Sequence, residues 1–215
     1  MISNVDHLVY ATPDLDAGIA SVEHLLGCTA VPGGRHEDWG TRNALISLGD
    51  TAYLEIIGPD PESTLGTDPM LFGIDRLDGP GLVTWAAKGT RLADLVTSAR
   101  AVGVDLGRVS TGSRALPDGS TLAWELTDPF VDRFGGVVPF FIDWGESPHP
   151  AAMLPGSCEL VDLTLRHPDA DAVERSLRAV GVPMDVTEVG SVQITATIRT
   201  SHGVVELSQR NPTQR

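Results

Sequence analysis

The sequence predicts an α+β protein made of repeated βαβββ modules, which form cup-shaped, curved mixed β-sheets with the helices on the outside. The main observation is an internal repeat. Three times, a short apolar strand runs into a helix that ends at a glycine (Gly27, Gly103, Gly181) and then into further strand-like segments. Two copies close on a strand that carries a glutamate among apolar residues, Glu55 and Glu206. A single one-sided sheet cannot bury its apolar face alone, so modules must pair or wrap around a shared cavity.

The first module is expected over residues 1–58. Thr12 or Asp14 can cap its helix, and the Gly49-Asp50 pair between two apolar runs indicates a hairpin. The expected segments are a strand at residues 5–10, a helix to about residue 26, a short strand at 28–31, a Gly-rich loop at 32–40 and strands at about 42–48 and 52–57.

Two further modules are expected at residues 81–145 and 158–209, in one compact unit with the first. A connector rich in Pro, Gly and Asp (residues 59–80) and a Pro-rich linker (residues 146–157) separate the modules. The Pro117-Asp118-Gly119 sequence is typical of a hairpin turn. The expected strands lie at 82–87, about 104–109, 122–126, 138–144, 159–166, about 185–189, 192–199 and 203–208, with helices at 90–101 and 169–180.

The charge balance indicates which partners to expect. Lys and Arg total 15 against 29 Asp and Glu, so the formal net charge of −14 disfavours nucleic acid and anionic membranes. No apolar run approaches the roughly 20 residues of a membrane span, and the N-terminus has no secretory signal pattern. We therefore expect a cytoplasmic monomer or homodimer that binds a small molecule.

Several short stretches follow one another in an informative order. They are Asp6-His7-Leu8-Val9, Asp14-Leu15-Asp16, Gly34-Arg35-His36, Gly40-Thr41-Arg42-Asn43, Tyr53-Leu54-Glu55, Pro139-Phe140-Phe141-Ile142-Asp143-Trp144 and His149-Pro150. On these residues the chain resembles the vicinal oxygen chelate superfamily of glyoxalase I, extradiol dioxygenases and fosfomycin and bleomycin resistance proteins. It looks most like the glyoxalase-like domain branch. The resemblance implies a cup built from paired βαβββ modules.

The resemblance also implies a metal site. It places His7 and Glu55 at the metal-ligand positions of the first module. An imidazole and a carboxylate on adjacent strands suit a divalent ion such as Zn, Mn, Fe, Ni or Co, with positions left for two vicinal oxygens of a substrate. At the equivalent first-strand positions the second module has Thr84 or Trp85 and the third has Asp162 or nearby residues, while Asp143 lies near the corresponding end of the second module. Glu206 aligns with Glu55 and would complete the set only if the first and third modules share the cavity.

Each candidate ligand also has a structural interpretation. His7, flanked by apolar residues, is equally typical of a hydrogen-bonded core histidine. A carboxylate such as Glu55 between apolar residues needs a partner, which is a metal, a catalytic proton or an arginine such as Arg42. Glu206 has the same need unless its strand lies at an edge, with the side chain in water. Without a metal, Glu55 would act as a general base.

Four other residues are candidates for substrate contacts. His36 lies in the Gly-rich loop with Asn43 close by, a mixture suited to binding a polar ligand, and His36 is also a candidate catalytic residue. Trp144 and His149 flank the Pro-rich linker, from which they could close the cup. Packing against the third module is the alternative for both.

The leading functional hypothesis is a small-molecule enzyme of the lyase, isomerase or dioxygenase type that acts on a compact, oxygen-rich substrate. The alternative is a protein with the same cup that binds a drug or metabolite without chemistry. A purely structural role would predict a cup filled by its own side chains.

Overall fold

The computed structural model describes residues 2–65, 70–115, 121–156 and 158–209. Its strands are β1 (Val5–Ala11), β2 (Val31–His36), β3 (Thr41–Ser47), β4 (Tyr53–Pro59), β5 (Gly81–Lys88), β6 (Val109–Ala115), β7 (Thr121–Thr127), β8 (Phe140–Asp143), β9 (Glu159–His167), β10 (Val186–Glu188), β11 (Gln193–Thr200) and β12 (Gly203–Ser208). Its helices are α1 (Leu15–Leu26), α2 (Leu92–Ala101) and α3 (Ala170–Ala179), with 3-10 turns η1 (Ile2–Asn4), η2 (Leu71–Arg76) and η3 (Pro150–Met153). None of the described helices is both long and apolar enough to span a lipid bilayer.

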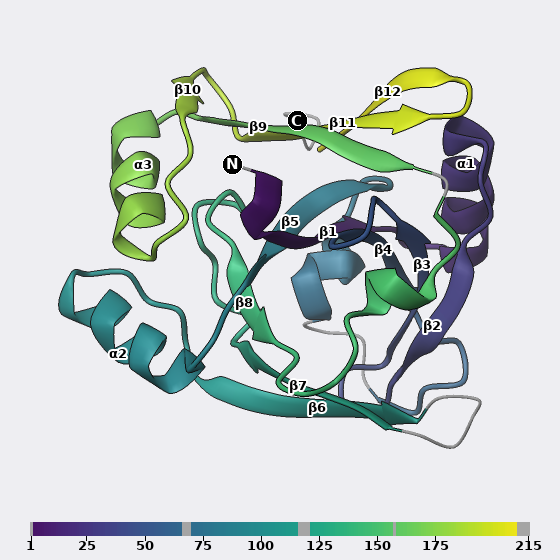
Figure 1. Cartoon of the computed structure of the whole chain (residues 1–215), viewed down its shortest axis with the longest axis horizontal. Coiled ribbons are helices and arrows are strands. Elements are labelled where there is room, and N and C mark those ends of the chain that lie inside the picture. The colour runs from purple at the N-terminus through teal and green to yellow at the C-terminus, as the bar shows by residue number, and fades with distance from the viewer. Residues whose placement is uncertain (1, 66–69, 116–120, 157, 210–215) are drawn as a thin grey trace.

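Within these residues the strands form two sheets. The larger has eight strands in the order β2-β3-β4-β1-β5-β8-β7-β6, and the smaller has the order β10-β9-β11-β12. At the centre of the larger sheet, β1 and β5 are antiparallel to each other, and each has a parallel strand on its outer side, β4 and β8. The first two modules therefore share one curved sheet, and the third module forms the second sheet (Figure 1). The predicted cup-shaped α+β fold with flanking helices is confirmed.

The two faces of the larger sheet bury different cores. Because strand side chains alternate between faces, Leu8 and Trp85 point to one face, where they join a core shared with the helices and the third module. Val9 and Ile57 point to the inner face of the curve, where they pack with residues of η2, including Leu71. The inner face and η2 together enclose the interior of the cup.

The first helix follows the expected caps. Asp14 at its N-terminus accepts a hydrogen bond from the backbone N–H of Ala17 (3.1 Å). Gly27 at its C-terminus takes the left-handed conformation, with φ of 66°. These caps define where α1 begins and ends, and the chain then returns to the sheet as β2.

Some segments differ from the sequence prediction. Strand β2 covers much of the predicted Gly-rich loop, because an edge strand with a register shift between Pro32 and Arg35 tolerates Pro and Gly. The strand predicted at about 104–109 is wrong, since Gly107 turns the chain at φ of 71° and β6 begins only at Val109. The predicted turn at Pro117-Asp118-Gly119 lies outside the described residues.

Two glycines with positive φ allow a test of how tightly β5 is packed. Gly136 has φ of 88°, and a Cβ there would lie 1.9 Å from the carbonyl oxygen of Val83 on β5; Gly145 has φ of 53° and open space around it. Gly145→Ala should cost about 1–2 kcal/mol through backbone strain alone. Gly136→Ala should cost at least about 2 kcal/mol more, because a backbone oxygen cannot move aside. Urea unfolding of both variants measures the difference, and equal losses would contradict this packing.

Candidate functional site

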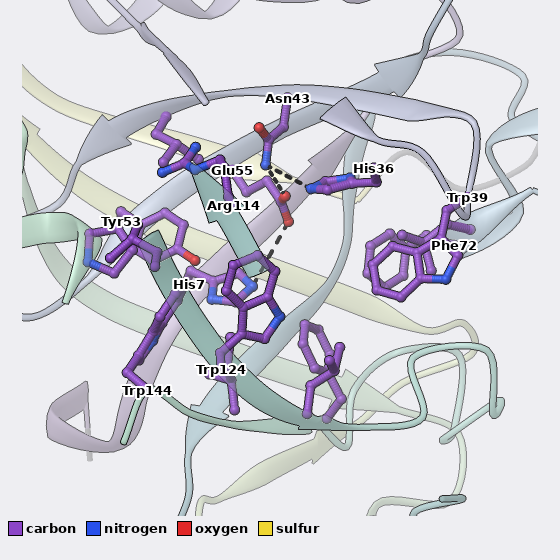
Figure 2. A pocket seen from close by; sticks show the side chains of 17 residues that line it. His7, His36, Trp39, Asn43, Tyr53, Glu55, Phe72, Arg114, Trp124 and Trp144 are labelled. Atoms are coloured by element: carbon purple, nitrogen blue, oxygen red, sulfur yellow. Dashed lines mark hydrogen bonds and ion pairs between the residues drawn. The ribbon is translucent and has the colours of Figure 1, made fainter. Parts of the chain in front are cut away.

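A pocket lies inside the cup, between the first and second modules (Figure 2). It has a cavity volume of about 70 Å³. Since one water needs roughly 10–15 Å³ of such space, the pocket has room for a small ligand or for the reacting end of a larger one. The residues that line it are His7, His36, Trp39, Asn43, Leu45, Tyr53, Glu55, Leu71, Phe72, Arg114, Leu122, Trp124, Leu126, Phe140, Ile142, Trp144 and Pro150.

Strand alternation positions the polar side chains of the first module. Tyr53 and Glu55 are two residues apart on β4, so both point inward. His7 pairs with Tyr53 across the β1–β4 ladder, and Leu45 pairs with Glu55 across the β3–β4 ladder. Asn43, two residues before Leu45, points into the same pocket. Three adjacent strands thus deliver an imidazole, a phenol, a carboxylate and an amide to one place.

A bulge in β1 brings Asp6 onto the same side as His7. The register with β5 shifts between Val5 and His7, which leaves Asp6 as the extra residue. One oxygen of Asp6 lies 2.8 Å from His7 Nδ1. A carboxylate on Nδ1 fixes the ring orientation and turns Nε2 of His7 towards Glu55.

Asp6 is completely buried and binds two further side chains. His149 Nε2 lies 3.1 Å from Oδ2 of Asp6, and Trp144 Nε1 donates to the same oxygen at 3.2 Å. The backbone N–H of Ala151 donates to His149 Nδ1, so Nε2 is the nitrogen of His149 that carries the proton. Burial raises the pKa of Asp6, but the hydrogen bonds from His149 and His7 outweigh it, and the pKa lies below the usual 3.8. Asp6 is therefore a carboxylate at neutral pH.

Glu55 is buried in the pocket between Asn43 and His7. The amide of Asn43 donates to Oε1 of Glu55 at 2.5 Å, and His7 Nε2 lies 3.9 Å from Oε2 (Figure 2). The same Nδ2 of Asn43 also lies 3.5 Å from His36 Nε2, while His36 Nδ1 lies 2.9 Å from the hydroxyl of Thr41. Burial lowers the pKa of His36, so this imidazole is neutral at neutral pH.

Arg114 brings a positive charge to the pocket from the second module. It lies on β6, at the opposite edge of the sheet from β2, and a Cβ on Gly34 of β2 would be 2.4 Å from its Cδ. A Cβ on Gly33 would likewise be 2.0 Å from Oδ1 of Asn43. The glycine pair therefore makes room for Asn43 and Arg114. Burial lowers the pKa of Arg114, and the nearby carboxylate of Glu55 opposes this change.

Aromatic rings form much of the pocket wall. His7 stacks on Tyr53 with ring centroids 4.6 Å apart and meets Phe140 edge-on at 5.4 Å. Trp124 and Trp144 lie 5.3 Å apart between centroids. Burial raises the pKa of Tyr53 well above its usual value, so its phenol is neutral. The pocket thus combines a flat apolar wall with a compact polar end.

The structure brings most of the predicted site residues together. His7, Glu55, His36, Asn43 and Trp144 line the pocket. His149 lies behind it, on Asp6. Glu206 is not brought to this site: it lies on β12, at the edge of the second sheet, and it is exposed. The alternative partner of Glu55, Arg42, instead pairs with Asp16 at 2.9 Å.

Sequence reasoning missed Asp6, Tyr53, Trp124 and Arg114. Tyr53 had a usable signal, because it lies two residues before Glu55 and therefore on the same face of the strand. Asp6 had only its position beside His7, and alternation would have placed it on the opposite face. Arg114 and Trp124 had no local signal, because their positions depend on how far the sheet curves.

The pocket has too few metal-ligating side chains to hold a divalent ion tightly. In the described part of the chain, no group of three or more His, Cys, Asp or Glu side chains is placed to hold a metal. His7 Nε2 and Glu55 Oε2 are two possible metal ligands that face one another. Asp6 instead holds hydrogen bonds with His7, His149 and Trp144. Catalytic zinc sites have three protein ligands. The described residues therefore do not fit such an ion.

A curved sheet formed by two βαβββ modules around a pocket is the arrangement predicted from the resemblance to the vicinal oxygen chelate superfamily. The chain belongs to the glyoxalase-like domain family, whose family model matches residues 5–181. This confirms the resemblance on which the site was predicted. No curated protein matches the chain.

Solved structures share the fold at low sequence identity. A hypothetical protein from Staphylococcus aureus superposes with a TM-score of 0.61 at 13% identity, over 97% of this chain and 86% of that one. A mutant of 4-hydroxymandelate synthase from Streptomyces coelicolor has a TM-score of 0.53 at 15% identity, over 99% and 65%. Methylmalonyl-CoA epimerase from Mycobacterium tuberculosis has a TM-score of 0.43 at 23% identity, over 69% and 91%. At these identities the likeness to the first two structures concerns the fold alone.

The buried carboxylate of Asp6 generates a prediction about acid stability. Because its pKa is lowered by folding, Asp6 contributes stability that is fully present above about pH 5 and is lost as the pH falls through the folded-state pKa. Asp6→Asn should lower the free energy of unfolding at pH 7 by about 2–4 kcal/mol, because an amide cannot accept from all three donors. It should also reduce the loss of stability between about pH 5 and pH 2.

Urea unfolding across this pH range measures both effects. Asp162→Asn on β9 is the control, because Asp162 is exposed and should leave both quantities unchanged. An acid dependence of Asp6→Asn equal to that of the wild type would contradict the ionised state of Asp6.

Proposed function

We propose that this protein is a small-molecule enzyme of the isomerase or lyase type, in which Glu55 removes a proton from a carbon next to a carbonyl group. The observation that carries the proposal is the position of Glu55. It is a buried carboxylate that faces the pocket, with Asn43 on one oxygen and His7 Nε2 3.9 Å from the other. A carboxylate that is held in place by its neighbours and faces a pocket is positioned to act as a general base on a bound substrate.

The neighbours of Glu55 have complementary tasks in this proposal. Asn43 fixes the carboxylate, and Gly34 N–H donates to Oδ1 of Asn43 at 2.7 Å, which fixes the amide in turn. His7, held through Nδ1 by Asp6, presents Nε2 beside the same carboxylate, 3.9 Å from Oε2 of Glu55, where it can take over the proton that Glu55 removes. His36 is neutral and orients the substrate by hydrogen bonding.

Arg114 supplies the charge that such a reaction requires. Removal of a proton next to a carbonyl places negative charge on the carbonyl oxygen, and a fixed cation lowers the energy of that state. Arg114 lines the pocket and makes no hydrogen bond to another described side chain. Its guanidinium is therefore available for the substrate oxygen.

Replacement of the proposed base tests the chemistry. Wild-type protein in D₂O should exchange the α-hydrogen of at least one member of a panel of small 2-oxo acids, α-hydroxy ketones and thioesters, followed by proton NMR. Glu55→Gln should slow this exchange by about 10²- to 10⁴-fold, the usual contribution of a general base. Glu206→Gln is the matched control, because Glu206 occupies the corresponding repeat position but is exposed on β12.

The same experiment separates this proposal from a binding protein without chemistry. Compounds that bind to wild type and Glu55→Gln with equal affinity, as followed by tryptophan fluorescence, and that show no exchange with either protein would favour the binding role. Exchange that survives in Glu55→Gln would instead assign the base to another residue.

Members of the superfamily commonly use divalent metals, so the metal content is a separate test. His7 and Glu55 provide only two metal ligands. Protein purified without a chelator and without an affinity-tag metal should therefore contain well below one divalent ion per chain. Glu55→Ala should contain the same small amount. Near-stoichiometric metal in the wild type that disappears in Glu55→Ala, measured by elemental analysis, would overturn the metal-free form of the proposal.

A further inference from the structure

A second cavity borders η2, whose residues also line the candidate site. Its volume is about 630 Å³, within the usual range of about 300–1,000 Å³ for ligand pockets. It lies between η2, β5 and residues 129–136, and Phe72 lines both cavities. The second cavity is therefore separate from the site of the proposed chemistry but shares a wall with it.

A buried cation faces this cavity with part of its hydrogen bonding unused. Arg133 is 5% exposed, and its Nη1 donates to the backbone carbonyl of Asp128 at 2.7 Å, whereas its Nε has no hydrogen-bond partner. Burial lowers the pKa of Arg133 to about 10. A buried charge without a close counter-ion is costly, so an anion beside it would be stabilised.

The nearby carboxylates are engaged elsewhere. Asp128 Oδ1 accepts from the backbone N–H of Phe130 at 2.8 Å, and Asp132 Oδ1 accepts from that of Gly135 at 2.9 Å. Among the described residues, no carboxylate lies within ion-pairing distance of Arg133. Asp128, Asp132 and Asp105 therefore attract Arg133 only from beyond ion-pairing distance, and its Nε is left without a hydrogen-bond acceptor.

A second buried polar group in this cavity is also unsatisfied. Gln209 is held by its backbone N–H, which donates to the carbonyl of Ile194 at 2.9 Å, and its Oε1 is buried without a hydrogen-bond partner. Its amide can offer either an acceptor or, when turned over, two donors. The remaining lining is largely apolar and includes Met70, Leu77, Val83 and Val131.

We propose that this second cavity binds a small organic anion, with its carboxylate or phosphate group on Arg133 and an apolar body against Met70, Leu77 and Val83. The charge of Arg133 requires an anion, the fork of its guanidinium suits oxyanions, and the apolar lining favours an occupant with a hydrocarbon part. This proposal does not depend on the reaction assigned to Glu55.

The resonance of the Arg133 Nε–H group gives a direct test in the wild-type protein. Titration with hexanoate should shift this resonance saturably in ¹H–¹⁵N spectra, and its assignment follows from its disappearance in Arg133→Lys. Hexan-1-ol, which has the same chain without the charge, should bind at least about tenfold more weakly, as expected for loss of a charge-assisted hydrogen bond. Inorganic phosphate should shift the same resonance with lower affinity, because it has no apolar body.

Variants distinguish the cavity from the exposed surface. Leu77→Trp fills the cavity without removing Arg133 and should weaken hexanoate binding at least tenfold, whereas Arg178→Gln, an exposed arginine on α3, should leave it unchanged. Equal binding of hexanoate and hexan-1-ol, or unchanged binding by Leu77→Trp, would overturn the proposal. If phosphate binds as tightly as hexanoate, Arg133 still binds an anion, but the proposed role of the apolar lining is wrong.

Discussion

The pocket depends on a buried charge, the carboxylate of Asp6. It has no solvent contact, and it is stabilised by donors from two distant parts of the chain: His7 beside it, and Trp144 and His149 after β8. A carboxylate buried without these donors would cost several kcal/mol or become protonated. The same contacts orient the imidazole of His7 towards Glu55. One electrostatic requirement thus holds the second half of the chain against the first and sets the geometry of the pocket.

The first two modules have equivalent strands but supply different kinds of side chain to the pocket. Each of the first two modules contributes its own four strands to one sheet. The first module supplies the carboxylate, the amide and the imidazoles of the pocket, whereas the second supplies mainly Arg114 and aromatic rings such as Trp124. Such a division suits a pocket that binds the flat or apolar part of a ligand on one side and its oxygens on the other. The third module forms a sheet of its own and packs on the outer face of the cup, away from the pocket.

Local patterns in the sequence predicted the fold and several residues that line the pocket, and the unpredicted parts depend on long-range geometry. Period-two alternation and the resemblance together indicated His7 and Glu55, because a polar residue in an apolar strand needs a partner. Asp6 escaped prediction because only a bulge turns it inward, and a bulge depends on the neighbouring strand. Glu206 matched Glu55 in the repeat, but the repeat does not determine which modules share a cavity.

The contact between Asp6 and His149 joins residues 143 positions apart. During synthesis the N-terminal strand therefore leaves the ribosome long before its hydrogen-bond donors exist, and the first module has a carboxylate that nothing local can satisfy. Closing so long a loop costs conformational entropy, which the packing of both modules and of the segment that follows them must offset. The hydrogen bonds of Asp6 thus distinguish the complete fold from incomplete ones. A chain that stops short of the Pro-rich linker, or pairs its modules wrongly, retains an uncompensated charge in its core.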